Sequence, residues 1–224
     1  MTDVNLVVML TYNDVTVENA YEVFDSCKDL PVQHWGFKNV GLPKPEMKKL
    51  VDYMKANGKT TYLEVVTYDE ASCLDAAKTA IEAGFDTLMG TVYFPSVHAY
   101  LKEQGMEYSP FVGKVSGSPS ILEGSYESIV EEAKARMADG INAFDLLAYR
   151  HVEDGEALAR YFCKNVDAKV CIAGSISSFQ RIDVMEDIHP WGFTMGSALF
   201  DHKFVPDGDF RTNLKAVVDY MASL

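Results

Sequence analysis

Lys169-Val-Cys-Ile-Ala-Gly-Ser-Ile-Ser-Ser178 and Trp191-Gly-Phe-Thr-Met-Gly-Ser-Ala-Leu-Phe200 are the two stretches that say most about the fold of this chain. Each is a short apolar run that stops at a Gly-Ser pair and continues into a helical pattern. A Gly-Ser step at the end of a strand leaves backbone N–H groups exposed and lets a ligand approach closely. A helix that begins directly afterwards adds partial positive charge at the same point. The two stretches therefore predict consecutive strand–helix units that bind one phosphate between them.

Apolar runs and helical patterns alternate in the same way along the whole chain. The runs of strand length are 5–10, 32–37, 61–66, 87–90, 110–115, 144–148, 169–173 and 193–195. The helical patterns are 17–29, 44–57, 70–83, 97–104, 125–138, 154–165, 178–188 and 209–223. Strand–helix alternation implies parallel pairing through right-handed crossovers, and eight such units close a barrel without leaving an open sheet edge. We therefore predict an α/β fold, a (β/α)8 TIM barrel formed by one domain over residues 1–224. A doubly wound open sheet is the alternative, but the first strand lacks a Gly-rich nucleotide loop.

Composition narrows the class of protein further. With 48% hydrophobic residues the chain can fill a closed core, and its net charge of −13 argues against nucleic acid as a partner. No apolar run approaches the roughly 18 residues of a membrane span, and the N-terminus lacks a basic signal region. The four cysteines show no metal-ligand spacing, which indicates reduced thiols. We expect a cytoplasmic protein that binds no metal or cofactor and does not contact a membrane. Assembly into a homo-oligomer, such as a homodimer, is compatible with the sequence.

Side chains that meet a substrate in a βα barrel lie at the carboxyl ends of the strands. Lys38 ends the second predicted strand, and Glu64 is the only carboxylate within the third. A buried carboxylate beside a lysine is a common general acid/base pair, although the two could equally form a structural ion pair. Lys114 ends the predicted fifth strand and precedes a Gly/Ser/Pro-rich loop, where it would anchor an anion or form a Schiff base. The predicted catalytic residues are thus Lys38, Glu64 and Lys114.

Other residues after predicted strands are expected to face the substrate. They are Asn13 after the first strand and Tyr149 and Arg150 after the sixth. Asp14 is interpreted as a cap for the first helix, and His151 as a solvated loop residue.

The stretches Ala173-Gly-Ser-Ile-Ser-Ser178 and Met195-Gly-Ser-Ala-Leu-Phe200 resemble the phosphate motif of the ribulose-phosphate-binding barrel superfamily. That superfamily includes the histidine-biosynthesis isomerases and thiamine-phosphate synthase. The resemblance implies phosphate contacts at Gly174, Ser175, Gly196 and Ser197. The usual first motif has two consecutive glycines, and Ser175 stands in place of the second.

No single member of that superfamily supplies a catalytic set that fits. The decarboxylases and synthases with an Asp-x-Lys-x-x-Asp motif would need carboxylates where Gly36 and Gly41 stand around Lys38, so decarboxylation of the orotidylate or keto-gulonate type is not expected. The histidine-pathway isomerases use acidic residues at the ends of strands one and five, where this chain has Thr11 and Lys114. The two histidines and two aspartates of the metal-dependent epimerases cannot be assembled either.

The resemblance and the strand-end residues together favour a metal-independent enzyme acting on a phosphosugar or another phosphorylated metabolite. Its reaction would be that of an isomerase, an epimerase, or an aldolase or other lyase. The alternative is a non-catalytic regulatory barrel that binds a phosphometabolite and resembles the glycerol-uptake antiterminator.

Overall fold

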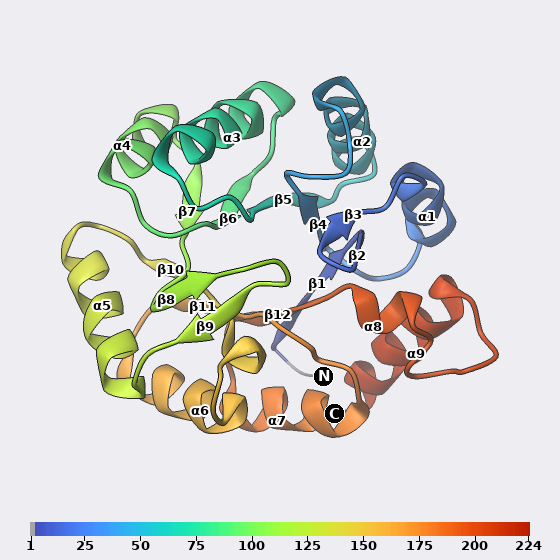
Figure 1. Cartoon of the computed structure of the whole chain (residues 1–224). Helices are drawn as coiled ribbons and strands as arrows, with labels where there is room; N and C mark the ends of the chain where they lie inside the picture. The colour runs from blue at the N-terminus through green and yellow to red at the C-terminus, as the bar shows by residue number, and fades with distance from the viewer. Residues whose placement is uncertain (1–2) are drawn as a thin grey trace.

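A computed structural model describes residues 3–224 and shows eight parallel strands arranged as a nearly closed barrel (Figure 1). Their order around the barrel is β10-β11-β12-β1-β4-β5-β6-β7. These strands are β1 (Asn5–Met9), β4 (His34–Lys38), β5 (Thr60–Val65), β6 (Thr87–Gly90), β7 (Glu107–Ser109), β10 (Ala143–Leu146), β11 (Lys169–Ile172) and β12 (Gly192–Met195). No ladder joins β7 to β10, but the Asp145 N–H donates to the Pro110 carbonyl at 3.1 Å across that seam. The predicted (β/α)8 barrel is confirmed.

Helices cover the outside of the strands (Figure 1). They are α1 (Ala20–Cys27), α2 (Lys44–Ala56), α3 (Glu70–Ala83), α4 (Pro95–Gln104), α5 (Tyr126–Ala138), α6 (Gly155–Asn165), α7 (Phe179–Ile188), the short α8 (Ser197–Phe200) and α9 (Phe210–Ser223). The side chains of Ser125, Asp154, Ser178 and Asp209 accept backbone N–H groups at the first turns of α5, α6, α7 and α9. Such caps satisfy donors that a helix start leaves unpaired, so they fix where each helix begins. No helix within residues 3–224 is both long and apolar enough to cross a membrane.

The fifth unit differs from the prediction of one strand over 110–115. The barrel strand is β7, which ends at Ser109, one residue before a proline that cannot donate to a ladder. The chain then leaves the barrel and forms an antiparallel hairpin of β8 (Lys114–Ser116) and β9 (Ile121–Glu123), with Lys114 paired to Glu123. Figure 1 shows this hairpin extending across the open end of the barrel.

Two smaller elements follow other barrel strands at the same end. The strands β2 (Thr11–Tyr12) and β3 (Val15–Thr16) form a tight hairpin after β1, and the 3-10 turn η1 (Ala148–Arg150) follows β10. Asn13 and Asp14 make the β2–β3 turn with φ of 49° and 62°, a conformation that asparagine and aspartate tolerate better than most residues.

The N-terminal end of the barrel is closed by side chains. The Lys169 ammonium lies 4.1 Å from the centre of the Trp191 ring and 2.6 Å from a Glu107 carboxylate oxygen. His34 packs against Trp191 and Tyr62, and burial, with a smaller contribution from Lys169, lowers the pKa of its imidazole to about 4. These side chains fill the N-terminal end of the barrel, and the cavity described below lies at the opposite end, where the strands have their carboxyl termini.

Candidate active site

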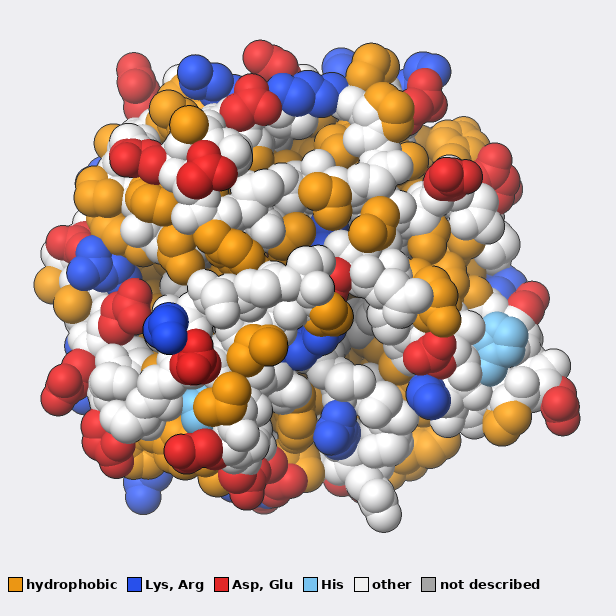
Figure 2. Space-filling view, in the orientation of Figure 1, with side chains coloured by type: hydrophobic (Ala, Val, Ile, Leu, Met, Phe, Trp, Pro, Cys, Tyr) orange, Lys and Arg blue, Asp and Glu red, His pale blue; other side chains and the backbone are white. Residues whose placement is uncertain are grey.

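A cavity of about 80 Å³ opens at the C-terminal ends of the strands. A cavity needs about 10–15 Å³ of such volume to hold one water molecule, so there is room for a small ligand. The Gly-Ser pairs at 174–175 and 196–197 line this cavity together with Lys38, Glu64 and Arg150. Figure 2 shows a hollow near the middle of this face with basic and acidic side chains at its edge. The structure thus brings the predicted phosphate residues and two of the three predicted catalytic residues to one place.

The two Gly-Ser loops form one wall of the cavity. Gly174 has a φ of 119°, and a Cβ there would lie 2.8 Å from the Cβ of Tyr149. A Cβ on Gly196 would lie 2.8 Å from the carbonyl oxygen of Thr11. Within the described part of the chain, the amides of residues 175, 176, 197 and 198 donate no hydrogen bond to another protein group. Because unpaired N–H groups at such turns bind anions, this wall can hold a phosphate.

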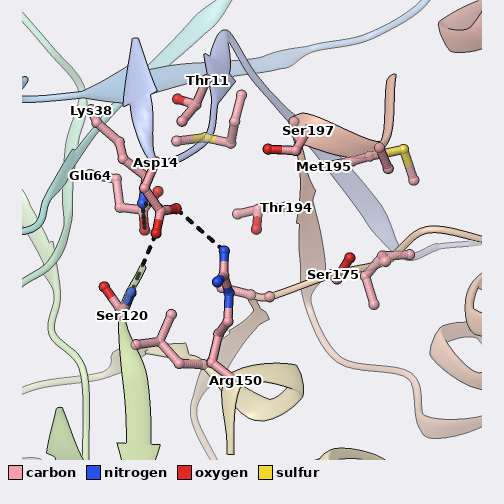
Figure 3. Close-up of a pocket in the computed structure, with 17 residues that line it drawn as sticks. Thr11, Asp14, Lys38, Glu64, Ser120, Arg150, Ser175, Thr194, Met195 and Ser197 are labelled. Carbon is pink, nitrogen blue, oxygen red and sulfur yellow. Dashed lines mark hydrogen bonds and ion pairs between the residues drawn. The ribbon is translucent and has the colours of Figure 1, made fainter. Parts of the chain in front are cut away.

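The opposite wall is formed by Lys38 and two carboxylates (Figure 3). The Lys38 ammonium lies 3.0 Å from Asp14 Oδ1 and 3.3 Å from Glu64 Oε1, and all three side chains are largely buried. Lys38 and Glu64 are register partners on β4 and β5, which explains why they meet. Burial alone would lower the pKa of Lys38, but attraction to Glu64 and Asp14 outweighs it and leaves that pKa above its usual value. Lys38 is therefore an ammonium ion at neutral pH.

Asp14 links three parts of the cavity wall. Its carboxylate accepts hydrogen bonds from the Lys38 ammonium, from Arg150 Nη2 at 3.3 Å and from the Ser120 N–H at 3.3 Å (Figure 3). Burial pushes the pKa of Asp14 upward, but Lys38, with help from Arg150 and Ser120, lowers it below its usual value. Asp14 lies in the β2–β3 turn, well before α1, so the interpretation of it as a helix cap is wrong.

The β8–β9 hairpin contributes Ser120 to the cavity. Besides its N–H bond to Asp14, Ser120 shares a hydroxyl–hydroxyl hydrogen bond of 2.5 Å with Tyr68, which follows β5. The hairpin is thereby attached to two other barrel units and covers part of the mouth.

Three predicted residues lie elsewhere. The Lys114 side chain is 75% exposed and pairs with Glu123 at 2.9 Å, because residue 114 belongs to the hairpin and not to a barrel strand. Asn13 is exposed at the β2–β3 turn while its neighbour Asp14 points into the site. Tyr149 does not line the cavity; its backbone and Cβ pack directly behind Gly174. His151 is buried and bonded to the Gly124 carbonyl at 2.8 Å, so it is not a solvated residue.

Sequence reasoning missed Asp14 and Ser120 as parts of the site, and Asp145 beneath it. Asp145 lies on β10, is 0% exposed, and neither of its carboxyl oxygens has a hydrogen-bond partner within residues 3–224. It stands as a single carboxylate in an apolar run, which is the signal that singled out Glu64. Asp14 and Ser120 carried no such signal, because both reach the site through turns whose geometry the sequence does not specify.

Comparison with known proteins gives structural likeness only. No protein-family model matches the sequence, and no curated protein matches it significantly. Orotidine 5'-phosphate decarboxylase from Pyrococcus horikoshii OT3 superposes with a TM-score of 0.70 at 12% identity, covering 98% of this chain and 100% of that one. The tryptophan synthase complex from Pyrococcus furiosus gives 0.69 at 15% identity, covering 100% and 99%. A structure described as native KDPGal gives 0.68 at 12% identity, covering 99% and 98%.

These matches span the whole length of both chains. This chain is a TIM barrel. At such low identity the likeness establishes the fold alone, because one barrel architecture supports many unrelated reactions. The function has to be argued from the cavity.

Proposed function

We propose that this chain is an enzyme that binds the phosphate group of a small metabolite on its two Gly-Ser loops and transfers a proton at the other end of the bound molecule. The observation that carries the proposal is one cavity lined by both loops and by Lys38 and Glu64. The phosphate would accept N–H groups at 175, 176, 197 and 198, and the Ser175 and Ser197 hydroxyls could donate as well. Two of the structural neighbours are described as an orotidine 5'-phosphate decarboxylase and as native KDPGal, and phosphate is part of the name of the first.

The charges of the opposite wall favour stabilisation of an anion that forms during the reaction. A lysine held as an ammonium ion between two carboxylates does not attack a carbonyl, since Schiff-base formation requires the neutral amine. It can instead stabilise an enolate or an oxyanion, or donate a proton to it. Glu64, at 3.3 Å from that ammonium, would accept a proton from substrate carbon. Isomerisation and epimerisation by proton transfer beside a carbonyl, and retro-aldol lysis without a Schiff base, all pass through such an anion.

Arg150 would bind the part of the ligand that lies between the two walls. Arg150 lines the cavity, its side chain is 33% exposed, and its guanidinium contacts Asp14 through a single bond of 3.3 Å. A guanidinium with most donors unused suits a second carboxylate, carbonyl or hydroxyl group of the substrate.

Decarboxylation is a second candidate reaction, favoured by one observation. The sequence lacks carboxylates at positions 36 and 41, but in space Asp14 and Glu64 flank Lys38 from two other barrel units. A carbanion left by the loss of CO2 would meet the same ammonium proton donor.

The proposal is tested by screening phosphorylated sugars and keto acids for thermal stabilisation of the protein, followed by turnover assays on the ligands that bind. Binding by wild type together with turnover that is lost in Lys38→Ala supports an enzyme. Binding without turnover of any ligand would instead support the regulatory barrel. If no phosphorylated compound in the screen binds, both functions are refuted.

A further inference from the structure

Asp145 lies inside the barrel, one layer beneath the cavity. It is paired in register with Cys171 on β11, and Cys171 belongs to the cluster of Val7, Met9, Tyr62 and Met89 inside the barrel. The residues two positions further along, Leu147 and Ala173, line the cavity. Since side chains two apart on a strand point to the same side, Asp145 faces the barrel interior directly below the ligand site.

The carboxyl group of Asp145 has no partner that would stabilise its negative charge. It is completely buried, and neither oxygen accepts a hydrogen bond from any residue that the structure describes. The charged or titratable groups that act on it are Lys38 on β4, Glu64 on β5 and Cys171 on the neighbouring strand β11. Lys38 is the only cation among them, and its ammonium is already shared by Asp14 and Glu64. An isolated buried carboxylate is too costly to persist, so such a group keeps its proton.

We propose that Asp145 keeps its proton at neutral pH and lies beneath the ligand site as a neutral carboxylic acid. Burial, reinforced by the charge of Glu64 and opposed by Lys38, raises the pKa of Asp145 well above its usual value.

The role in catalysis rests on the proposed function. In that mechanism Glu64 takes a proton from substrate carbon and later delivers the same proton to the product. Asp145 keeps its own proton throughout. An enolate that forms above it therefore meets the Lys38 ammonium without repulsion from a third carboxylate.

The protonation state can be measured without a substrate. In wild-type protein labelled with 13C at the aspartate carboxyl carbons, NMR at pH 7 should show one protonated carboxyl group. That signal should be absent from Asp145→Asn, remain in the control Asp167→Asn, whose residue is exposed, and titrate at lower pH in Glu64→Gln. A spectrum in which every aspartate is ionised at pH 7, or a protonated signal that persists in Asp145→Asn, would overturn the proposal.

The dependence of stability on pH gives a second readout. A carboxyl group with a raised folded-state pKa binds its proton more tightly in the native state, so its contribution to stability is present at low pH and is lost as pH rises through that pKa. From about pH 4 upward, the folding equilibrium constant of wild type should fall about tenfold per pH unit relative to Asp145→Asn. Parallel curves for the two proteins would contradict the assignment. Should Asp145→Asn fail to fold, the wild-type titration still decides, and neither readout depends on turnover.

Discussion

At the scale of single residues, the site depends on how charges are paired. Lys38 is held between Asp14 and Glu64, Asp14 is shared with Arg150, and Asp145 lies beneath them without a cation of its own. A buried lysine with two carboxylate neighbours remains charged, whereas a buried carboxyl group without a cation becomes neutral. Lys38 is therefore a cation and Asp145 a neutral acid, although both carry their protons, and the chemistry proposed for the cavity follows from this difference in charge.

Replacement of Lys38 by alanine should remove turnover and also destabilise the protein. The change leaves two largely buried carboxylates without their shared cation, and breaking a buried ion pair in this way costs about 3–5 kcal/mol. Chemical denaturation measures the stability loss. Lys114→Ala is the matched control, because its exposed pair with Glu123 should contribute at most about 1 kcal/mol and should not affect turnover. Turnover that survives in Lys38→Ala would show that the proposed mechanism is wrong.

Asp14 should make the folding stability of the protein fall more steeply as pH decreases. Its pKa is lowered in the folded protein, so the stability that it contributes is present above the unfolded value of about 3.9 and is lost as pH falls through the folded value. Unfolding of wild type and Asp14→Asn should be compared from pH 6 downward to about pH 2. Wild type should lose its stability advantage below about pH 4. An advantage that does not change with pH would contradict the ion-pair network around Asp14.

At the scale of elements, the loops that end the barrel strands carry the function. The first Gly-Ser loop needs a glycine at position 174, because its φ is 119° and Tyr149 occupies the space of a side chain. Gly174→Ala should displace the loop and weaken the binding of a phosphorylated ligand by at least tenfold, a loss of about 1.4 kcal/mol. Isothermal titration calorimetry measures this change in affinity.

Gly84→Ala is the matched control for the loop. Gly84 also has a positive φ, of 84°, but no atom lies within 4 Å of the site of its Cβ, and it ends α3 far along the chain from the Gly-Ser loops. The Gly84→Ala protein should lose stability through backbone strain while it keeps its affinity for the ligand. Equal loss of affinity in both variants would argue against a specific role for the loop at 174.

The β8–β9 hairpin should be held over the cavity by its contact with Tyr68. Tyr68→Phe removes the hydroxyl that bonds to Ser120, at a cost of about 0.5–1.5 kcal/mol. Amide hydrogen exchange should accelerate within 114–123, because the hairpin opens more often. Tyr161→Phe is the control, since within residues 3–224 the Tyr161 hydroxyl makes no hydrogen bond. Unchanged exchange in Tyr68→Phe would mean that this bond does not hold the hairpin in place.

At the scale of the whole molecule, the order of elements was readable from the sequence. The alternation of apolar runs with capped helical patterns predicted every barrel strand except the fifth, and for α3 and β6 even the bounds agree. The fifth unit was misplaced because the apolar run at 110–115 is a buried connection that leads into the hairpin strand β8, while the true barrel strand at 107–109 includes a glutamate and is short. Apolar character alone does not distinguish a barrel strand from a buried connection.

The candidate site was predictable where it depends on strand ends and not where it depends on turns. Lys38, Glu64, Gly174 and Gly196 follow from the barrel topology, since parallel strands bring their carboxyl ends together. Asp14 was misread because the sequence does not reveal that residues 11–16 form a hairpin that turns the carboxylate inward. Contacts made through such turns depend on backbone geometry that a strand-and-helix pattern does not contain.

In the proposed function, the two Gly-Ser loops bind one phosphate within reach of Lys38. The most direct test is a crystal structure determined in the presence of millimolar inorganic phosphate. We predict one phosphate between the loops, bound by the backbone amides of 175, 176, 197 and 198. A cavity without phosphate at that concentration, or phosphate bound only at other surfaces of the molecule, would contradict the claim.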